Sequence, residues 1–231
     1  MTDRPKLLVS VRNLDEAKAA VAGGADIIDI KEPDNGSLGK ADDQVINEIV
    51  SDITDRPISA ALGELHEKQS VHTPIDYVKI GLTNASCDWC DELANQFQGM
   101  KNARAIAVAY ADFDRVGAPT VQDVLDWAPV NAAGLLIDTA IKDGRGLFDW
   151  IDESDLIRII EEAHASGLMV GLAGSLEGSD LIKAATLEPD IVAVRGAACS
   201  SGDRRSGIDS DRVKAIVRTL DKLLVRREAA T

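Results

Sequence analysis

The sequence of 231 residues has no long hydrophobic run and no apolar segment at its start. No apolar stretch approaches the roughly 18 residues that a membrane-spanning helix needs. The first residues, MTDRPKLLVSVR, do not contain the apolar region of a secretory signal. We therefore expect no membrane partner and a cytoplasmic location.

Basic residues are scarce as well. The chain has 25 lysines and arginines against 39 aspartates and glutamates, and its formal net charge is −14. Binding to a nucleic-acid backbone requires a basic patch, so this balance argues against a nucleic-acid partner. An anionic substrate would need basic side chains gathered inside a pocket. The composition is compatible with a homo-oligomer but does not indicate one.

Only three cysteines are present, Cys87, Cys90 and Cys199. The segment CDWC matches a C-x-x-C pattern, but a structural zinc site needs a second pair of ligands. The other cysteine and the three histidines are scattered along the chain. We therefore expect thiols without a metal or redox role, and no metal site.

Eight short runs rich in apolar and β-branched residues alternate with helical patterns. Runs that are apolar throughout are typical of parallel strands that are covered on their outer face. The predicted strands are Leu7–Val11, Asp26–Lys31, Ile58–Leu62, Tyr77–Leu82, Ala105–Tyr110, Gly134–Thr139, Met169–Ala173 and Ile191–Arg195.

Helix signals lie between these strands. Asn13 is a good N-cap for a helix that has Glu16 in its first turn and ends at Gly23–Gly24. A second helix is predicted from Asp155 to Ser166, with Ser154 as its cap. The last helix follows from the helical spacing of Val213, Ile216, Val217, Leu220, Leu223 and Leu224.

The strand–helix alternation predicts an α/β fold, a (β/α)8 TIM barrel that forms a single domain over residues 1–231. An open doubly wound sheet is the alternative, but no G-x-G-x-x-G follows the first strand. The stretch from Glu64 to Pro74 has no helical apolar face, so we predict a loop there. No linker or compositional break divides the chain.

Charged residues lie repeatedly at the carboxyl ends of the predicted strands, where α/β barrels carry their active sites. Asp29 and Lys31 are two residues apart on strand two, so they project to the same face. A rim network of paired charges without catalysis is the alternative interpretation. The other members are Lys79 on strand four, Asp138 on strand six, Lys142 just beyond it and Arg195 at the end of strand eight.

Several lysines in one site favour a particular chemistry. A lysine amine is a poor nucleophile near its ordinary pKa of about 10.4. Burial and neighbouring ammonium groups lower that pKa and free the amine to form an imine with a carbonyl. The imine acidifies the adjacent carbon and gives an enamine that attacks a second carbonyl, while another lysine and the aspartates move protons. The residue types therefore predict class I aldolase chemistry.

Phosphate binding is indicated at the loops after strands seven and eight, Gly171–Ser175 and Val194–Arg204. Their small residues allow backbone N–H groups to approach an anion, and an arginine there can add charge. The candidate phosphate ligands are Gly174, Ser175, Arg195, Gly196 and Ala197.

Six segments spread over nearly the whole chain are similar to one enzyme family. They are AGGADIIDIKEPDNGSLG, YVKIGL, AYADFDRVGA, LLIDTAIKDGRGLFDW, GLMVGLAGS and VRGAACSSGDR. They resemble the (5-formylfuran-3-yl)methyl phosphate synthases of methanofuran biosynthesis. The resemblance implies a lyase without a cofactor that condenses two molecules of a small phosphorylated aldehyde, glyceraldehyde 3-phosphate, with loss of one phosphate and water.

The resemblance also implies roles for individual residues. On the pattern of that family, Lys31 forms the Schiff base and Lys79 accepts the proton. Asp29, Asp138 and Lys142 would line the same pocket. Because two phosphates must be held, a second basic site is expected from Lys142, Arg145 or Arg115. The irregular stretch from Glu64 to Pro74 departs from the family, in which more helical sequence is usual.

Two other functions stay open at this point. The string DIKEPD fits the D-x-K-x-x-D pattern of orotidine-phosphate decarboxylase-like barrels, in which the lysine stays charged. One alternative is therefore a decarboxylase or isomerase of a sugar phosphate, and the other is a binding barrel without catalysis. Borohydride trapping with a triose phosphate separates the imine mechanism from both alternatives, since only an imine is reduced to a stable adduct.

Overall fold

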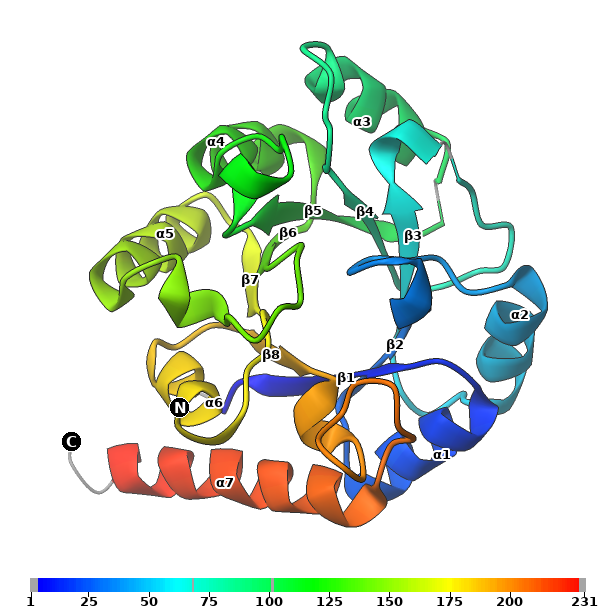
Figure 1. The fold of residues 1–231 in the computed structure, drawn as a ribbon, viewed down its shortest axis with the longest axis vertical. Coiled ribbons are helices and arrows are strands. Elements are labelled where there is room, and N and C mark those ends of the chain that lie inside the picture. The colour runs from blue at the N-terminus through cyan, green and yellow to red at the C-terminus, as the bar shows by residue number, and fades with distance from the viewer. Residues whose placement is uncertain (1–3, 68, 101, 229–231) are drawn as a thin grey trace.

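The computed structural model describes residues 4–67, 69–100 and 102–228. Parallel strands form a closed barrel in the order of the sequence, and β8 pairs with β1 (Figure 1). The predicted barrel and its eight strands are confirmed, with ends that agree within two residues. The strands are β1 (Lys6–Val11), β2 (Ile27–Ile30), β3 (Ile58–Glu64), β4 (Tyr77–Gly81), β5 (Arg104–Tyr110), β6 (Gly134–Asp138), β7 (Met169–Leu172) and β8 (Ile191–Val194).

The helices form a ring around the strands (Figure 1). Between β3 and β4, the described residues contain a short 3-10 turn, Leu65–Glu67, and no α-helix. The predicted loop is therefore confirmed for the described residues after Glu64, which itself still belongs to β3. The helices of the described residues are α1 (Leu14–Gly23), α2 (Asp43–Asp52), α3 (Trp89–Gln98), α4 (Val121–Asn131), α5 (Glu153–Ala165), α6 (Gly178–Thr186) and α7 (Ser210–Glu228).

The ends of α1 follow the sequence signals. The side chain of Asn13 accepts a hydrogen bond from the backbone N–H of Glu16 at 2.9 Å, which satisfies one of the first free N–H groups of the helix. Gly24 has a φ of 93°, a left-handed conformation that glycine adopts without a steric penalty, and α1 ends there.

The predicted start of α5 is wrong by two residues. The helix begins at Glu153, and Asp152 rather than Ser154 is the N-cap. The backbone N–H of Leu156 bonds to the carbonyl of Asp152 at 3.0 Å and closes the first turn there. The apolar face of the helix begins only at Leu156, so the hydrophobic pattern gives no signal for the polar turn before it.

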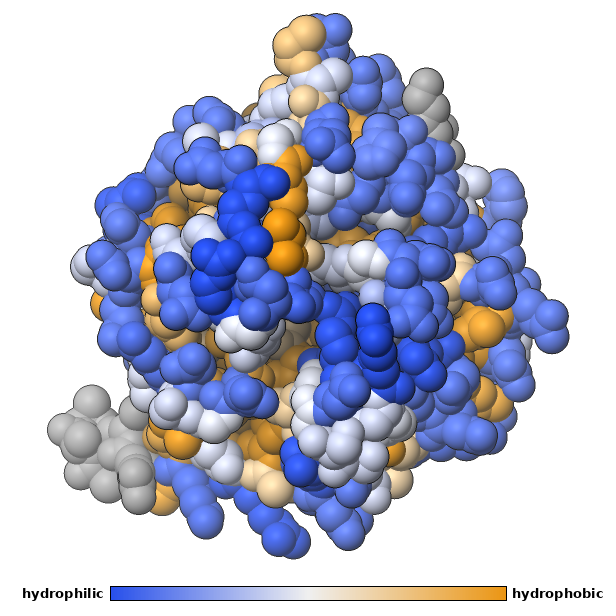
Figure 2. Space-filling view, viewed as in Figure 1, coloured by the Kyte–Doolittle hydropathy of each residue, from blue (hydrophilic) through white to orange (hydrophobic). Residues whose placement is uncertain are grey.

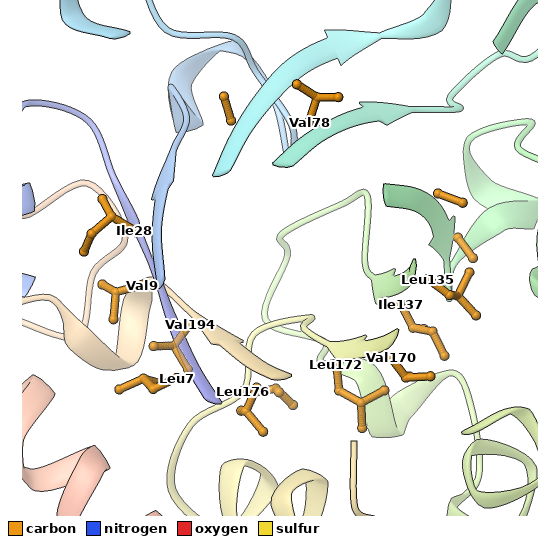
Figure 3. Close-up of a cluster of buried hydrophobic side chains, with 14 of the residues drawn as sticks. Leu7, Val9, Ile28, Val78, Leu135, Ile137, Val170, Leu172, Leu176 and Val194 are labelled. Atoms are coloured by element: carbon orange, nitrogen blue, oxygen red, sulfur yellow. The ribbon is translucent and has the colours of Figure 1, made fainter. Parts of the chain in front are cut away.

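Alternation along the strands sends successive side chains to opposite sides of the barrel wall. The outward side chains pack between the strands and the helices. Figure 3 shows part of this layer, including Leu7 and Val9 of β1, Ile28 of β2 and Leu135 and Ile137 of β6. All five are buried, and the removal of such side chains from water is the main driving force of folding.

The inward side chains change from apolar to polar along the strands. The lower layer contains Leu8, Ile27, Tyr77 and Leu136, which belong to a separate buried cluster inside the barrel. Two residues further along the same strands, the inward positions carry Ser10, Asp29, Lys79 and Asp138. Because the strands are parallel and in register, these polar groups meet at one end of the barrel.

Hydrophilic residues cover most of the surface in the view of Figure 1, with smaller apolar patches between them (Figure 2). This agrees with the high proportion of charged residues, 28% of the chain. Within the described residues, no helix is both long enough and apolar enough to cross a bilayer.

Candidate active site

A cavity of about 380 Å³ lies at the end of the barrel where the strands finish. All ten residues predicted for catalysis and phosphate binding line this cavity, although they come from five different strands and the loops that follow them. The structure therefore brings together the side chains that the sequence analysis selected. Their chemical roles stay predictions.

Asp29 and Lys79 form a buried ion pair at the base of the cavity. Oδ1 of Asp29 and Nζ of Lys79 are 2.5 Å apart, and the two side chains are 1% and 4% exposed. The hydroxyl of Ser10 donates to the second oxygen of Asp29 at 2.9 Å. Each buried charge thus has a partner, which is the condition under which charges are tolerated in a protein interior.

Asp138 and Lys142 form a second pair on the neighbouring side of the cavity. Nζ of Lys142 lies 2.6 Å from Oδ1 of Asp138 and 2.9 Å from Oγ1 of Thr139. Burial raises the pKa of Asp138, but Lys142, Lys31 and the backbone N–H of Thr139 favour the carboxylate, and the pKa falls to about 2. Asp138 is therefore a carboxylate at neutral pH.

Lys31 differs from the other two lysines because its amine has no partner. Among the described residues, no hydrogen bond or ion pair involves its side chain, which is nevertheless buried. Burial lowers the pKa of Lys31 from 10.5 to about 8. The carboxylates of Asp138 and Asp29 act against this shift, whereas the ammonium groups of Lys142 and Lys79 add to it. Lys31 is thus an unpaired amine that is partly neutral near pH 7.

The loop after β7 approaches the cavity with backbone in the left-handed region. Gly174 has a φ of 98° and Ser175 a φ of 55°. A Cβ atom on Gly174 would lie 3.2 Å from side-chain carbons of Thr139 and Leu147, so the position is tight as well as left-handed. The tight packing holds the loop against Thr139 and Leu147, and both Gly174 and Ser175 line the cavity.

Arg195 does not offer the free charge that the sequence analysis expected from it. Its side chain is 4% exposed and forms an ion pair with Glu16 of α1 at 2.8 Å. Its remaining donors bind the carbonyls of Ser10, Arg204 and Ser206, so all five N–H groups of the guanidinium are used. Unless these bonds break, Arg195 can offer its backbone to the cavity but not its guanidinium.

Arg115 and Arg145, two candidates for a second phosphate site, do not line the cavity. Both bind the carboxylate of Asp143, at 2.9 and 2.7 Å, and both lie over the ring of Trp150. The third candidate, Lys142, does line the cavity but is paired as described above.

Arg204, which was not among the predicted site residues, lines the cavity from the loop between β8 and α7. The lining also contains four acidic residues that were not predicted, Asp149, Glu177, Asp180 and Asp203. The run GDRR was the available signal, but it does not indicate which of its arginines turns inward. Within the described part of the chain, no group of three or more His, Cys, Asp or Glu side chains is arranged to hold a metal ion.

Comparison with solved structures shows the fold. Phosphoribosyl anthranilate isomerase from Thermotoga maritima aligns with a TM-score of 0.64 and 16% identity, over 94% of this chain and 99% of that chain. 3-Hexulose-6-phosphate synthase from Salmonella typhimurium aligns with a TM-score of 0.63 at the same identity and coverage.

Sequence comparison shows the family. The model of the family described as 4-HFC-P synthase matches residues 7–217. The (5-formylfuran-3-yl)methyl phosphate synthase of Methanopyrus kandleri is 39% identical over 88% of this chain and 93% of its own length. The protein of the same name from Methanocaldococcus jannaschii is 37% identical over 91% and 97%. The chain therefore belongs to the (5-formylfuran-3-yl)methyl phosphate synthase family.

Proposed function

We propose that this chain is a Schiff-base lyase that condenses two molecules of glyceraldehyde 3-phosphate to (5-formylfuran-3-yl)methyl phosphate for methanofuran biosynthesis. The observation that supports this proposal most strongly is the contrast between the three lysines of the cavity. Lys31 is buried without a partner, whereas Lys79 and Lys142 are each bound to a carboxylate. An imine requires a neutral amine, and Lys31 is the lysine whose surroundings favour that form.

In this mechanism, Nζ of Lys31 attacks the carbonyl carbon of one triose phosphate, and loss of water gives the imine. The imine withdraws electrons from the adjacent carbon, so removal of a proton there gives an enamine. The enamine carbon attacks the carbonyl carbon of the second triose. Elimination of phosphate and water, together with hydrolysis of the imine, then gives the furan and returns Lys31 as a free amine. Carbon, hydrogen and oxygen balance when one phosphate and two waters leave, so the overall reaction needs no redox cofactor.

The two ion pairs fit the proton transfers that these steps require. Lys79 projects inward at the base of the cavity and can exchange a proton with Asp29 over 2.5 Å. Lys142 and Asp138 can stabilise the charge that develops on the oxygens of the substrate. Asp29, Lys79 and Asp138 belong to strands, and Lys142 lies four residues beyond the end of β6, where its hydrogen bonds to Asp138 and Thr139 hold the amine.

Asp34 is the third acid of the D-x-K-x-x-D string on which the decarboxylase alternative rests. Asp34 does not line the cavity. Its side chain is 60% exposed and lies 3.7 Å from Arg205. Within this chain, the third acid of the string therefore lies outside the cavity that contains Asp29 and Lys31, so the cavity assembles only part of that pattern.

Incubation of the purified protein with glyceraldehyde 3-phosphate tests the proposal. We expect a furan aldehyde with strong ultraviolet absorbance and one inorganic phosphate released for every two trioses consumed. Lys31→Ala should abolish both signals, whereas Lys18→Ala, which changes an exposed lysine paired with Asp52, should retain them. An isomerised triose phosphate as the product, or full activity of Lys31→Ala, would refute the proposed reaction.

A further inference from the structure

We propose that Arg204 is the residue that binds the phosphate group of a triose phosphate while Lys31 holds its carbonyl carbon. The inference deepens the proposed function and rests on it, because it assumes a phosphorylated aldehyde in this cavity. It assigns the anion-binding charge to a residue of the loop between β8 and α7, residues 195–209.

The charges that line the cavity support this assignment. The five cationic residues of the lining are Lys31, Lys79, Lys142, Arg195 and Arg204. Three of them, Lys79, Lys142 and Arg195, are bound to carboxylates at 2.5 to 2.8 Å. Lys31 must be neutral to attack a carbonyl. Arg204 is therefore the cation left to balance a phosphate.

The side chain of Arg204 is free, but its backbone is fixed. Arg204 is half-buried, and among the described residues no hydrogen bond or ion pair involves its guanidinium. Its carbonyl accepts a hydrogen bond from Nε of Arg195 at 2.6 Å. Arg195 in turn is held by Glu16, so the loop is anchored to α1, beside which it lies in Figure 1.

Charged groups of the active site also act on the guanidinium of Arg204. Burial lowers the pKa of Arg204, and the carboxylate of Asp138 is the main charge that opposes this effect. An arginine remains protonated at neutral pH and presents paired N–H groups that match two phosphate oxygens. Arg204 therefore approaches the Asp138–Lys142 pair as a permanent cation with free donors.

The acidic wall of the cavity makes such a cation necessary. Glu177 and Asp180, at the start of α6, line the same cavity close to Gly174 and Ser175. Their charges repel an anion that approaches the backbone N–H groups of the loop after β7. A phosphate dianion bound there by N–H groups alone would face uncompensated repulsion, which the charge of Arg204 offsets.

The adjacent arginine provides a matched control. Arg205 has the same side chain and the same loop, but it is 77% exposed, does not line the cavity and lies opposite Asp34. A general effect of loop charge would appear in variants of both arginines. A specific phosphate contact would appear only at Arg204.

The experiment measures borohydride trapping at Lys31 as a function of aldehyde concentration, with glyceraldehyde 3-phosphate and with unphosphorylated glyceraldehyde. For Arg204→Ala we expect the half-saturating concentration of glyceraldehyde 3-phosphate to rise about 10- to 100-fold, the range of one or two lost charge-assisted hydrogen bonds. The value for glyceraldehyde should not change. Arg204→Lys should recover part of the loss, and Arg205→Ala should behave as the wild type.

Titration with inorganic phosphate by calorimetry tests the contact without any imine chemistry. The wild type and Arg205→Ala should bind phosphate, and Arg204→Ala should bind it at least about tenfold more weakly. If the wild type traps no aldehyde but still binds inorganic phosphate more tightly than Arg204→Ala does, the proposed reaction is wrong and the phosphate contact of Arg204 is supported. Equal phosphate binding by Arg204→Ala and the wild type, or an equal change for both aldehydes, would overturn the assignment.

Discussion

An unpaired amine inside the barrel should make the protein less stable than it would be without Lys31. At neutral pH the folded state holds a largely protonated lysine in surroundings that disfavour its charge, while the unfolded chain does not. The pKa of Lys31 is about 8 in the folded state against an ordinary value of 10.5. At 1.36 kcal/mol per pH unit, this difference corresponds to about 3 kcal/mol of lost stability.

The cost of Lys31 to the stability of the folded state depends on pH in a direction set by its pKa values in the folded and unfolded states. Below about pH 8, Lys31 is protonated in both states and the full cost is present. Between about 8 and 10.5 the unfolded chain keeps its proton while the folded protein loses it, so the stability of the folded state rises with pH. Above 10.5 both states carry a neutral amine, and the cost has disappeared.

The variant Lys31→Met replaces the amine with an apolar side chain of similar length. We expect its free energy of unfolding in urea to exceed that of the wild type by about 3 kcal/mol at pH 7, and this gain to vanish as the pH rises to 10.5. Lys222→Met, which changes an exposed lysine, should follow the wild type at every pH. A Lys31→Met protein that is no more stable at pH 7, or a gain that does not depend on pH, would refute the reasoning.

Three further predictions follow from the site. Glu16→Ala should lower the free energy of unfolding, measured in urea, by about 3 to 5 kcal/mol, because it leaves the buried guanidinium of Arg195 without its carboxylate. The control Glu48→Ala, which changes an exposed glutamate, should leave the free energy of unfolding unchanged. Activity should survive exhaustive chelation, since an amine activates the carbonyl; a loss that only added metal restores would contradict this. A crystal soaked in phosphate should hold the anion at Gly171–Ser175 and 195–198, and an anion found only at the opposite end of the barrel would contradict the orientation.

The barrel and the cluster of charges could be predicted because both depend on local patterns. Apolar runs of strand length identify the barrel wall, and a period of two residues places Asp29 and Lys31 on one face. Parallel strands then bring their carboxyl ends together whatever their separation in the sequence. The same geometry places Lys79 and Asp138 beside them.

The direction of the arginine side chains could not be predicted in this way. Arg195 turns toward Glu16, which is 179 residues away in the sequence and which the pattern identifies only as an acid in the first turn of α1. Once that ion pair forms, Arg195 has no free donor for an anion. We therefore assign the binding of the anion to Arg204. Arg204 and Arg205 are identical in type, and only the path of the loop distinguishes them.

The central claim is that Lys31 is the amine that forms the imine. Borohydride reduction in the presence of glyceraldehyde 3-phosphate, followed by peptide mass mapping, tests it most directly. We predict one adduct on the peptide that contains Lys31, no adduct in Lys31→Ala, and an adduct without turnover in Lys79→Ala. An adduct on Lys79 or Lys142 in the wild type would contradict the assignment.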